Sequence, residues 1–169
     1  MIVTIRPASA ADIPLMQSLE RDAAQAFRAV GYDFCADGPV RTHEEHERGL
    51  EGGAIFIAET DGEAAGFILL WVVDRHAHLT EISIAERFQR RGIGRALIEA
   101  GEDWARERGF DAITLTTFRD VAWNAPFYRS LGYAEYAPGG GELDLAAVQA
   151  EEAQSGYAGK PRITMKKAL

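Results

Sequence analysis

The sequence contains a single cysteine, Cys35, among 169 residues, so an intrachain disulfide is impossible. This cysteine usage is typical of a reducing compartment, and we expect a cytoplasmic protein. Long hydrophobic runs are also missing, because the longest, residues 66–73, is far shorter than the roughly 20 residues of a membrane-spanning helix. The N-terminus alternates like a strand and lacks the basic-then-apolar pattern of a signal peptide.

Basic residues are outnumbered, with 18 Lys and Arg against 26 Asp and Glu and a net charge of −8. Nonspecific binding to nucleic acid or to an anionic membrane needs a basic surface, so we expect neither partner. The acidic balance favours a cationic partner such as an amine or a basic peptide. A hydrophobic content of 47% is typical of a globular chain, and the length predicts one domain over residues 1–169.

Strand and helix patterns follow one another along the chain in an order typical of a mixed α/β protein. The predicted strands are residues 2–6, 54–59, 63–73, 78–84, 111–118, 133–136 and 162–166, and the predicted helices are 13–30, 40–50, 93–108, 125–131 and 143–154. Residues 31–39 are predicted to be a loop. Gly66 indicates a bulge or a close backbone approach. Because a helix joins strand 78–84 to strand 111–118, we expect these two strands to be parallel.

The most informative stretch runs from Ile82 to Leu97. It passes from the predicted strand Ile82-Ser83-Ile84 into a helix through Gln89-Arg90-Arg91-Gly92-Ile93-Gly94-Arg95-Ala96. The first turn of a helix has N–H groups without intrahelical partners, and the helix dipole adds positive charge there. Glycines let an anion approach the backbone, and arginines add full charges. The stretch therefore predicts a phosphate cradle, although a glycine-punctuated helix start with a solvated basic face is the simpler alternative.

Two common nucleotide fingerprints do not fit this stretch. The G-x-G-x-x-G pattern would need a third glycine where Leu97 stands, and the Gly-Lys-Ser/Thr of a P-loop is missing. The pattern Q-x-x-G-x-G that is present, after a strand, resembles the acyl-CoA motif of the GNAT N-acetyltransferase superfamily. A second stretch, Trp123-Asn124-Ala125-Pro126-Phe127-Tyr128-Arg129-Ser130-Leu131-Gly132-Tyr133, resembles the family's Asn-containing helix that ends in Tyr-x-x-Leu-Gly-Phe/Tyr. The order of the two motifs, with a helix and a strand between them, makes the pair informative.

The resemblance implies a GNAT acyl-CoA N-acyltransferase fold. This fold is a mixed α/β fold with a twisted, mostly antiparallel sheet, a parallel strand pair at the CoA-binding cleft, and helices on both faces. The implied reaction is direct acyl transfer from acetyl-CoA to an amine, without a metal. The implied cofactor contacts are Ile82, Ser83, Ile84, Gln89, Arg90, Arg91, Gly92, Ile93, Gly94, Arg95, Ala96, Asn124, Phe127 and Tyr128.

Two side chains are the catalytic candidates. The resemblance places Tyr128 as the acid that protonates the CoA thiolate, and a tyrosine that only packs against the pantetheine is the alternative. Glu81 interrupts an apolar strand and shares a face with Ser83, and a carboxylate there is costly unless it is solvated or paired. It is the candidate base, with an ion pair to an arginine across the sheet as the alternative. His76 and His78 are second candidates, acting through a water.

The sequence does not identify the acceptor substrate, because a fold-level resemblance does not determine it. A small amine, an amino acid, an antibiotic, a protein N-terminus and a lysine all fit, and the acidic balance favours a small amine. The candidate acceptor-binding residues are Phe27, Tyr32, Phe34, His78 and Trp123. The loop aromatics among them either fold back into the core or line a pocket.

Three further alternatives remain. The chain could be a CoA-binding sensor without turnover, a longer-chain acyltransferase, or a phosphate-binding enzyme of another fold. Residues 138–161 depart from the simplest family pattern, and they cover the acceptor site or form an oligomer contact, for example in a homodimer. His43 and His46 lie at helical spacing among acidic residues but match no zinc pattern, so we expect a solvated helical face and no metal.

Overall fold

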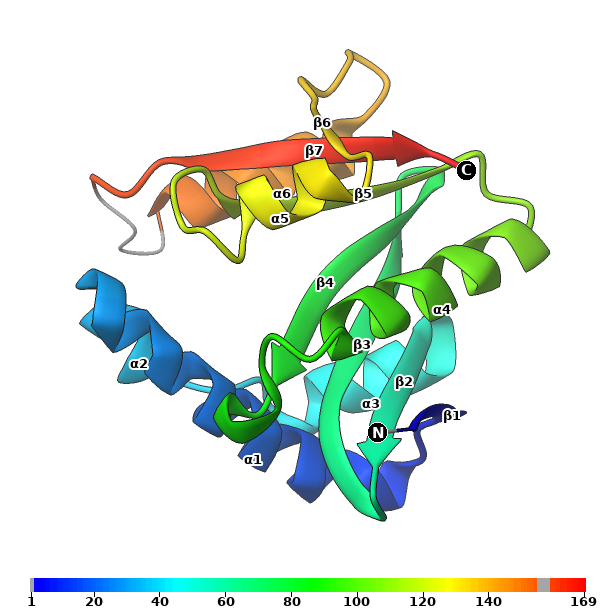
Figure 1. Ribbon diagram of the computed structural model, residues 1–169. Helices are drawn as coiled ribbons and strands as arrows, with labels where there is room; N and C mark the ends of the chain where they lie inside the picture. Colours follow the sequence, from blue (N-terminus) through cyan, green and yellow to red (C-terminus); the bar gives the residue numbers. More distant parts are fainter. Residues whose placement is uncertain (1, 155–158) are drawn as a thin grey trace. The chain divides into compact units, whose positions relative to one another are not determined.

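In the computed structural model, residues 2–154 and 159–169 are described. The strands are β1 (Val3–Pro7), β2 (Ala54–Thr60), β3 (Glu63–Val73), β4 (His76–Ile84), β5 (Ala112–Phe118), β6 (Ala134–Glu135) and β7 (Arg162–Ala168) (Figure 1). The helices are α1 (Ile13–Ala24), α2 (Asp33–Ala36), α3 (His43–Gly52), α4 (Ile93–Glu107), α5 (Ala125–Ser130) and α6 (Leu143–Gln154). Short 3-10 turns lie at η1 (Ala10–Asp12), η2 (Gln25–Val30) and η3 (Glu86–Phe88). None of the helices in the described ranges is long and apolar enough to cross a membrane.

The strands form a seven-stranded sheet in the order β1-β2-β3-β4-β5-β7-β6. β4 and β5 are parallel, with Ala77 opposite Ile113 and Leu79 opposite Leu115. The pairs β1–β2, β2–β3, β5–β7 and β6–β7 are antiparallel. The expected mixed α/β fold, mostly antiparallel with one parallel pair, is therefore confirmed.

The chain divides into two compact units. The first comprises Met1–Trp71 and Thr80–Trp104, and the second comprises Val72–Leu79 and Ala105–Leu169, so β3, β4 and α4 contribute residues to both. The expectation of a single domain stays a prediction.

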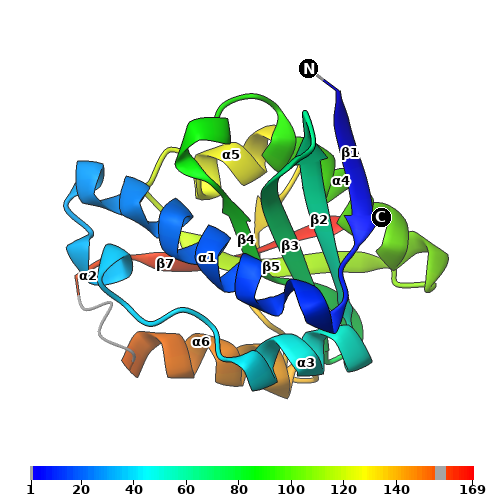
Figure 2. The same ribbon diagram turned by 90° about the horizontal axis from the view of Figure 1, so that it is seen from below.

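In the first unit, α3 and α4 cover opposite faces of β3 (Figure 2). A Cβ added to Gly49 of α3 would lie 3.2 Å from Leu69, and one added to Gly101 of α4 would lie 3.2 Å from Leu70. Neighbouring residues of one strand point to opposite faces, so β3 is buried on both sides, as its apolar sequence indicates.

In the second unit, α5 and α6 cover opposite faces of the β5–β7 pair (Figure 1). Thr164 of β7 accepts a hydrogen bond from Gln149 of α6. Lys167, which points to the other face, lies 5.6 Å from the ring of Tyr133, just after α5. Because side chains alternate between the two faces along β7, α6 and α5 contact opposite faces of this strand.

The structure differs from several local predictions. The predicted loop at 31–39 contains the short helix α2, because Tyr32 and Ala36 turn inward to become buried while Asp33 and Asp37 pair with Arg28. The strand predicted at 78–84 begins earlier, at His76. The segment 138–161, which departs from the simplest family pattern, lies partly outside the described residues.

The prediction for Gly66 is confirmed. The register of β2 and β3 shifts between Ala58 and Glu59, opposite Gly66. A Cβ on Gly66 would lie 2.5 Å from the backbone oxygen of Ser83 in β4. β3 and β4 therefore approach closely at this glycine, just before the predicted phosphate cradle.

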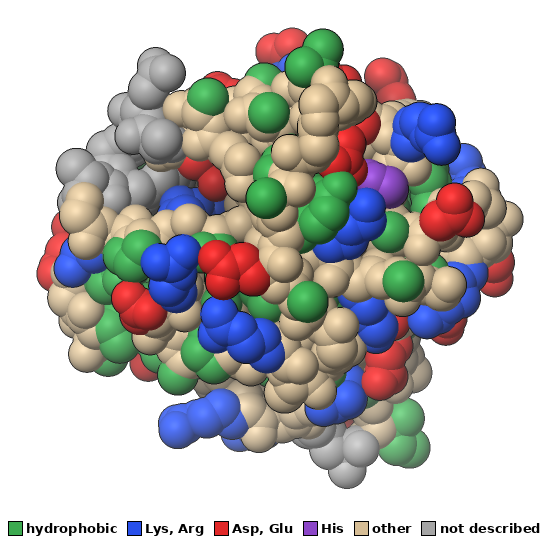
Figure 3. Space-filling model, turned by 90° about the horizontal axis from the view of Figure 1, so that it is seen from above, with side chains coloured by type: hydrophobic (Ala, Val, Ile, Leu, Met, Phe, Trp, Pro, Cys, Tyr) green, Lys and Arg blue, Asp and Glu red, His purple; other side chains and the backbone are tan. Residues whose placement is uncertain are grey.

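On the face shown in Figure 3, Lys and Arg side chains are interspersed with Asp and Glu side chains, and hydrophobic side chains are scattered between them. Such a mixed surface is typical of a globular protein.

Candidate active site

The predicted cradle lies in the first unit, where the chain passes from β4 into α4. Arg90 and Gly92 have positive φ angles of 59° and 83°, which turn the chain into the helix. The first hydrogen bond there runs from the Ala96 N–H to the Gly92 oxygen, at 3.1 Å. The N–H groups at Ile93, Gly94 and Arg95 precede it and have no helical partner to donate to. The start of α4 therefore presents backbone donors that the helix itself does not use.

The charges around these donors are positive. The side chains of Arg90, Arg91 and Arg95 are exposed, and the first turn of α4 contains no acidic residue. The helix dipole adds to their charge. The Gln89 side chain donates to the Ile84 oxygen at 3.0 Å and closes the loop. These residues fit the phosphates of CoA, although the contacts themselves stay a prediction.

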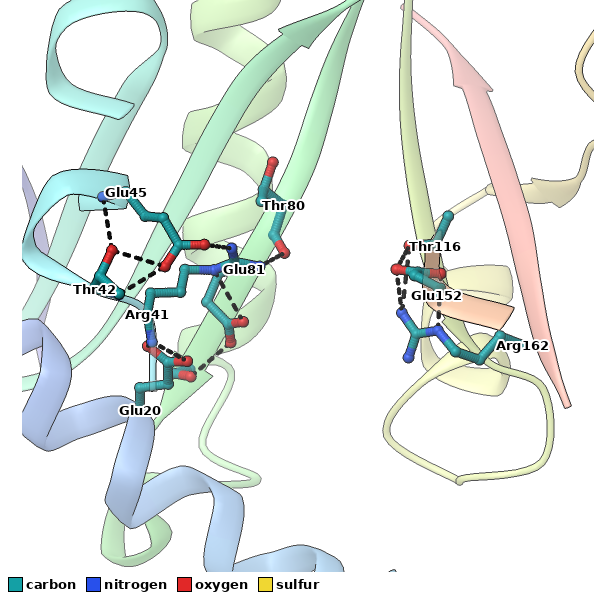
Figure 4. Close-up of polar contacts among 10 residues, drawn as sticks. Glu20, Arg41, Thr42, Glu45, Thr80, Glu81, Thr116, Glu152 and Arg162 are labelled. Carbon is teal, nitrogen blue, oxygen red and sulfur yellow. Dashed lines mark hydrogen bonds and ion pairs between the residues drawn. The ribbon is translucent and has the colours of Figure 1, made fainter. Parts of the chain in front are cut away.

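The strand before the cradle holds the candidate base. Ser83 is buried, and its hydroxyl donates to Glu81 Oε1 at 2.8 Å, so the two share a face as predicted. Glu81 Oε2 also lies 3.7 Å from Arg41 Nε (Figure 4). The ion pair expected as the alternative for Glu81 is therefore present. Its arginine comes from the segment before α3 and not from across the sheet.

Glu20 of α1 is a candidate that the sequence analysis missed. Its carboxylate oxygens accept the Arg41 backbone N–H at 3.1 and 3.2 Å (Figure 4). Burial and the negative charge of Glu81 raise the pKa of Glu20 to about 7, against the opposing effect of the Arg41 N–H. The sequence did contain a signal, because position 20 lies four residues after the buried Met16, on the apolar stripe of the helix.

In the second unit, α5 positions Asn124 and Tyr128. Asn124 stands at the N-cap position, but its side chain makes no capping bond. Its backbone, at φ −107° and ψ −119°, is not in the extended conformation from which a capping side chain reaches the first turn. Among the described residues, the buried Oδ1 of Asn124 has no hydrogen-bond partner.

Tyr128 is 4% exposed, and its backbone N–H donates to the Asn124 oxygen at 3.0 Å. Its ring centre lies 5.8 Å from that of Tyr133 and 5.5 Å from that of Phe127. The second motif is thus a short helix that gathers its aromatic side chains around Tyr128. Trp123, just before it, is 41% exposed.

The remaining substrate candidates differ in their surroundings. Tyr32 is 7% exposed and stacks between Phe27, at 6.2 Å, and Phe34, at 5.6 Å. Tyr32 thus folds back into the core, which is one of the two alternatives given for these aromatics. Phe34 is 37% exposed. His78 is 3% exposed, with Nδ1 2.9 Å from the Thr114 hydroxyl in the parallel strand pair.

The two histidines of α3 behave differently from each other. His43 is exposed, and its Nε2 lies 3.4 Å from a carboxylate oxygen of Glu47, as expected for a solvated face. His46 is fully buried and packs edge-on against Phe67, so the solvated-face interpretation is wrong for it. Neither ring nitrogen of His46 has a hydrogen-bond partner in the described part of the chain. Burial and the charge of Arg41 lower the pKa of His46.

A comparison with family models matches residues 15–133 to the acetyltransferase (GNAT) family. Both sequence motifs fall within or at the end of this range. The match covers more than half of the chain.

Solved structures show the same fold at low sequence identity. The ribosomal-protein-S18-alanine N-acetyltransferase of Escherichia coli has a TM-score of 0.72 at 22% identity, over 99% of this chain and 94% of that chain. The PaiA N-acetyltransferase of Thermoplasma acidophilum, in complex with coenzyme A, has a TM-score of 0.72 at 18% identity, over all of both chains. The N-acetylglutamate synthase of Neisseria gonorrhoeae, complexed with coenzyme A and N-acetyl-glutamate, has a TM-score of 0.71 at 18% identity, over 100% of this chain and 35% of that chain.

Proposed function

We propose that this chain, which belongs to the acetyltransferase (GNAT) family, transfers the acetyl group of acetyl-CoA directly to a primary amine of a small molecule. The observation that carries the proposal is the cradle at the start of α4. Backbone donors without a partner in the helix, the glycine turn at Gly92 and three exposed arginines meet there. That combination is suited to the phosphates of the donor.

The proposed reaction needs three proton transfers. The acceptor ammonium must lose a proton before its nitrogen can attack the thioester carbon. As the C–N bond forms and the C–S bond breaks, the nitrogen loses a second proton and the leaving thiolate takes one up. Tyr128 is the proposed acid for the thiolate, and Glu81 is the base that the sequence suggests. No covalent enzyme intermediate is required.

Charge and exposed aromatic surface bear on the acceptor class. The related folds include one named for a protein substrate, ribosomal protein S18, and one complexed with a small product, N-acetyl-glutamate. A net charge of −8 favours a cationic acceptor, and Phe34 and Trp123 offer exposed aromatic surface. We therefore place a small amine first and a protein N-terminus or lysine second. A CoA-binding sensor without turnover is the candidate from a different class.

The first test is thermal unfolding with and without acetyl-CoA. A ligand at one hundred times its dissociation constant stabilises the fold by about 2.7 kcal/mol, which raises the Tm by several degrees in a chain of this size. We expect that shift at millimolar acetyl-CoA. No shift would mean that the cradle does not bind CoA and would overturn the proposal.

The second test is CoA release with a panel of amines. The panel contains tyramine, a polyamine, glutamate and a peptide with N-terminal alanine. Tyr128→Phe should lower turnover at least about tenfold while the acetyl-CoA shift stays unchanged, because only the thiolate loses its acid. Unchanged turnover in this variant would overturn the role of Tyr128. A thermal shift without turnover on any amine would favour the sensor.

A further inference from the structure

Three carboxylates of the first unit surround one arginine. Arg41 Nη1 lies 3.6 Å from Glu45 Oε1, and Arg41 Nε lies 3.7 Å from Glu81 Oε2. Glu20 accepts the backbone N–H of the same residue (Figure 4). One guanidinium cannot balance three carboxylates, so the cluster carries an excess of negative charge when all three are ionised.

The guanidinium is also partly engaged elsewhere. Arg41 Nη2 donates to the Thr80 backbone oxygen at 3.1 Å, and the guanidinium lies 5.7 Å from the centre of the Trp71 ring. Its buried Nε has no hydrogen-bond partner among the described residues. The Arg41 guanidinium is therefore held against the Thr80 backbone and the Trp71 ring. It reaches the carboxylates of Glu45 and Glu81 only at ion-pair distance.

The three carboxylates have different partners. Glu45 accepts the Thr42 N–H at 2.7 Å and the Thr42 hydroxyl at 3.1 Å, which close the capping box of α3. Glu81 has the Ser83 hydroxyl and the Arg41 charge. Within the described residues, the Glu20 carboxylate has only the Arg41 backbone N–H as a donor. Glu20 is thus the member of the cluster with the fewest partners for its ionised form.

We propose that Glu20, and not Glu81, accepts the proton of the acceptor ammonium, and that Glu81 is a positioning residue held by Ser83 and Arg41. This inference rests on the proposed acetyl transfer. The proton moves from the ammonium nitrogen to a Glu20 oxygen. The neutral amine then forms the C–N bond as the C–S bond breaks. The nitrogen loses its second proton while the leaving thiolate takes one up from Tyr128, which is reprotonated, and Glu20 returns its proton to water.

The electrostatics of the cluster support this division of roles. Burial and the charge of Glu81 raise the pKa of Glu20 to about 7, which suits a base at neutral pH. The groups that act on Glu20 are Glu81 of β4, Glu45 of α3 and Arg41 with its backbone N–H. Glu20 is half-buried, so an acceptor or a water can reach it.

The test is the pH dependence of kcat/KM for the wild type, Glu20→Gln and Glu81→Gln, with the panel amine that gives the highest kcat/KM. We expect the wild type to show an acid limb near neutral pH. Glu20→Gln should lose this limb and roughly 100-fold of its rate, the usual size of general-base catalysis. Glu81→Gln should keep the limb but move it to lower pH, because the charge that raises the pKa of Glu20 is gone. Glu44→Gln, an exposed change on α3, is the matched control.

The opposite pattern, with the limb lost in Glu81→Gln and displaced in Glu20→Gln, would overturn the inference and leave the proposed function standing. So would an unchanged limb in Glu20→Gln. The acetyl-CoA thermal shift of each variant reports whether it is folded, and Glu20→Asp provides a second variant if Glu20→Gln is not. Absence of turnover by the wild type on every panel amine would overturn the proposed function and this inference together.

Discussion

At the scale of single residues, Gly66 is a position where a side chain cannot fit without displacing its surroundings. A Cβ there would meet the Ser83 oxygen at 2.5 Å and the Ile84 Cδ1 at 2.8 Å. The first is a backbone atom of β4, which cannot move without displacing the strand that leads to the cradle. We expect Gly66→Ala to lower the free energy of unfolding by roughly 1–3 kcal/mol, the usual cost of overpacking.

Urea unfolding of Gly66→Ala measures this cost directly. Gly52→Ala in α3 is the matched control, because nothing lies within 4 Å of a Cβ at that position. The control should be neutral or slightly more stable than the wild type, since alanine favours a helix. Equal stability of the two variants would show that β3 and β4 can separate without cost.

The sequence could identify residues by their local pattern, but it could not identify their distant partners. The alternation of β4 correctly placed Glu81 and Ser83 on one face. It could not show that Arg41, 40 positions earlier, supplies the ion pair. The same limit applies to His46, whose neighbours are charged although its own side chain packs on Phe67.

At the scale of elements, α6 is held to the second unit by polar contacts at its start. Asp74, in the turn between β3 and β4, accepts the N–H groups of Asp144 at 3.1 Å and Leu145 at 2.9 Å. Glu142 accepts hydrogen bonds from Gly139 and Tyr136 and lies 2.9 Å from His76 Nε2. The helix at 143–154 was predictable from its spacing. Its cap was not, because Asp74 lies 70 residues away in the sequence.

Removal of this distant cap should destabilise α6. We expect Asp74→Gly to lower the free energy of unfolding by about 1 kcal/mol, the usual worth of an N-cap side chain. Glycine is chosen because Asp74 has a φ of 54°, where alanine would add strain of its own. Hydrogen exchange of residues 146–152 should rise more than that of β5.

Asp74→Asn is the matched control for this change. Asparagine keeps an oxygen acceptor and tolerates the left-handed backbone, so its exchange rates should stay closer to those of the wild type. Equal protection of α6 in the wild type and in Asp74→Gly would show that the contacts of Glu142 alone hold the helix.

At the scale of the whole molecule, the sequence predicted the architecture better than the site. The order of strands and helices, the parallel pair and the two helix-covered faces follow from periodicity, turns and the family motifs. The acid–base groups of the site depend instead on burial and on neighbouring charges, and these arise only when distant segments meet. Glu20 and His46 are the two clearest cases.

These two groups make opposite contributions to the pH dependence of stability. The folded pKa of Glu20 is raised from 4.5 to about 7, so the native state binds more protons than the unfolded chain between these values. Stability from this group therefore falls as the pH rises through that window. The folded pKa of His46 is lowered from 6.5, so only the unfolded chain takes up its proton as the pH falls below that value. Stability from this group falls as the pH decreases.

We therefore expect Glu20→Gln to raise the Tm at pH 8 and to change it little at pH 4, because a neutral amide has no charge to bury.

His46→Leu should have the opposite profile, with a larger gain in Tm at pH 5 than at pH 8. The charged groups that act on His46 are Arg41, Glu45 and His43. The double variant should show a flatter Tm profile between pH 5 and pH 8 than the wild type. Equal gains at both pH values, in either single variant, would mean that its effect comes from packing and not from titration.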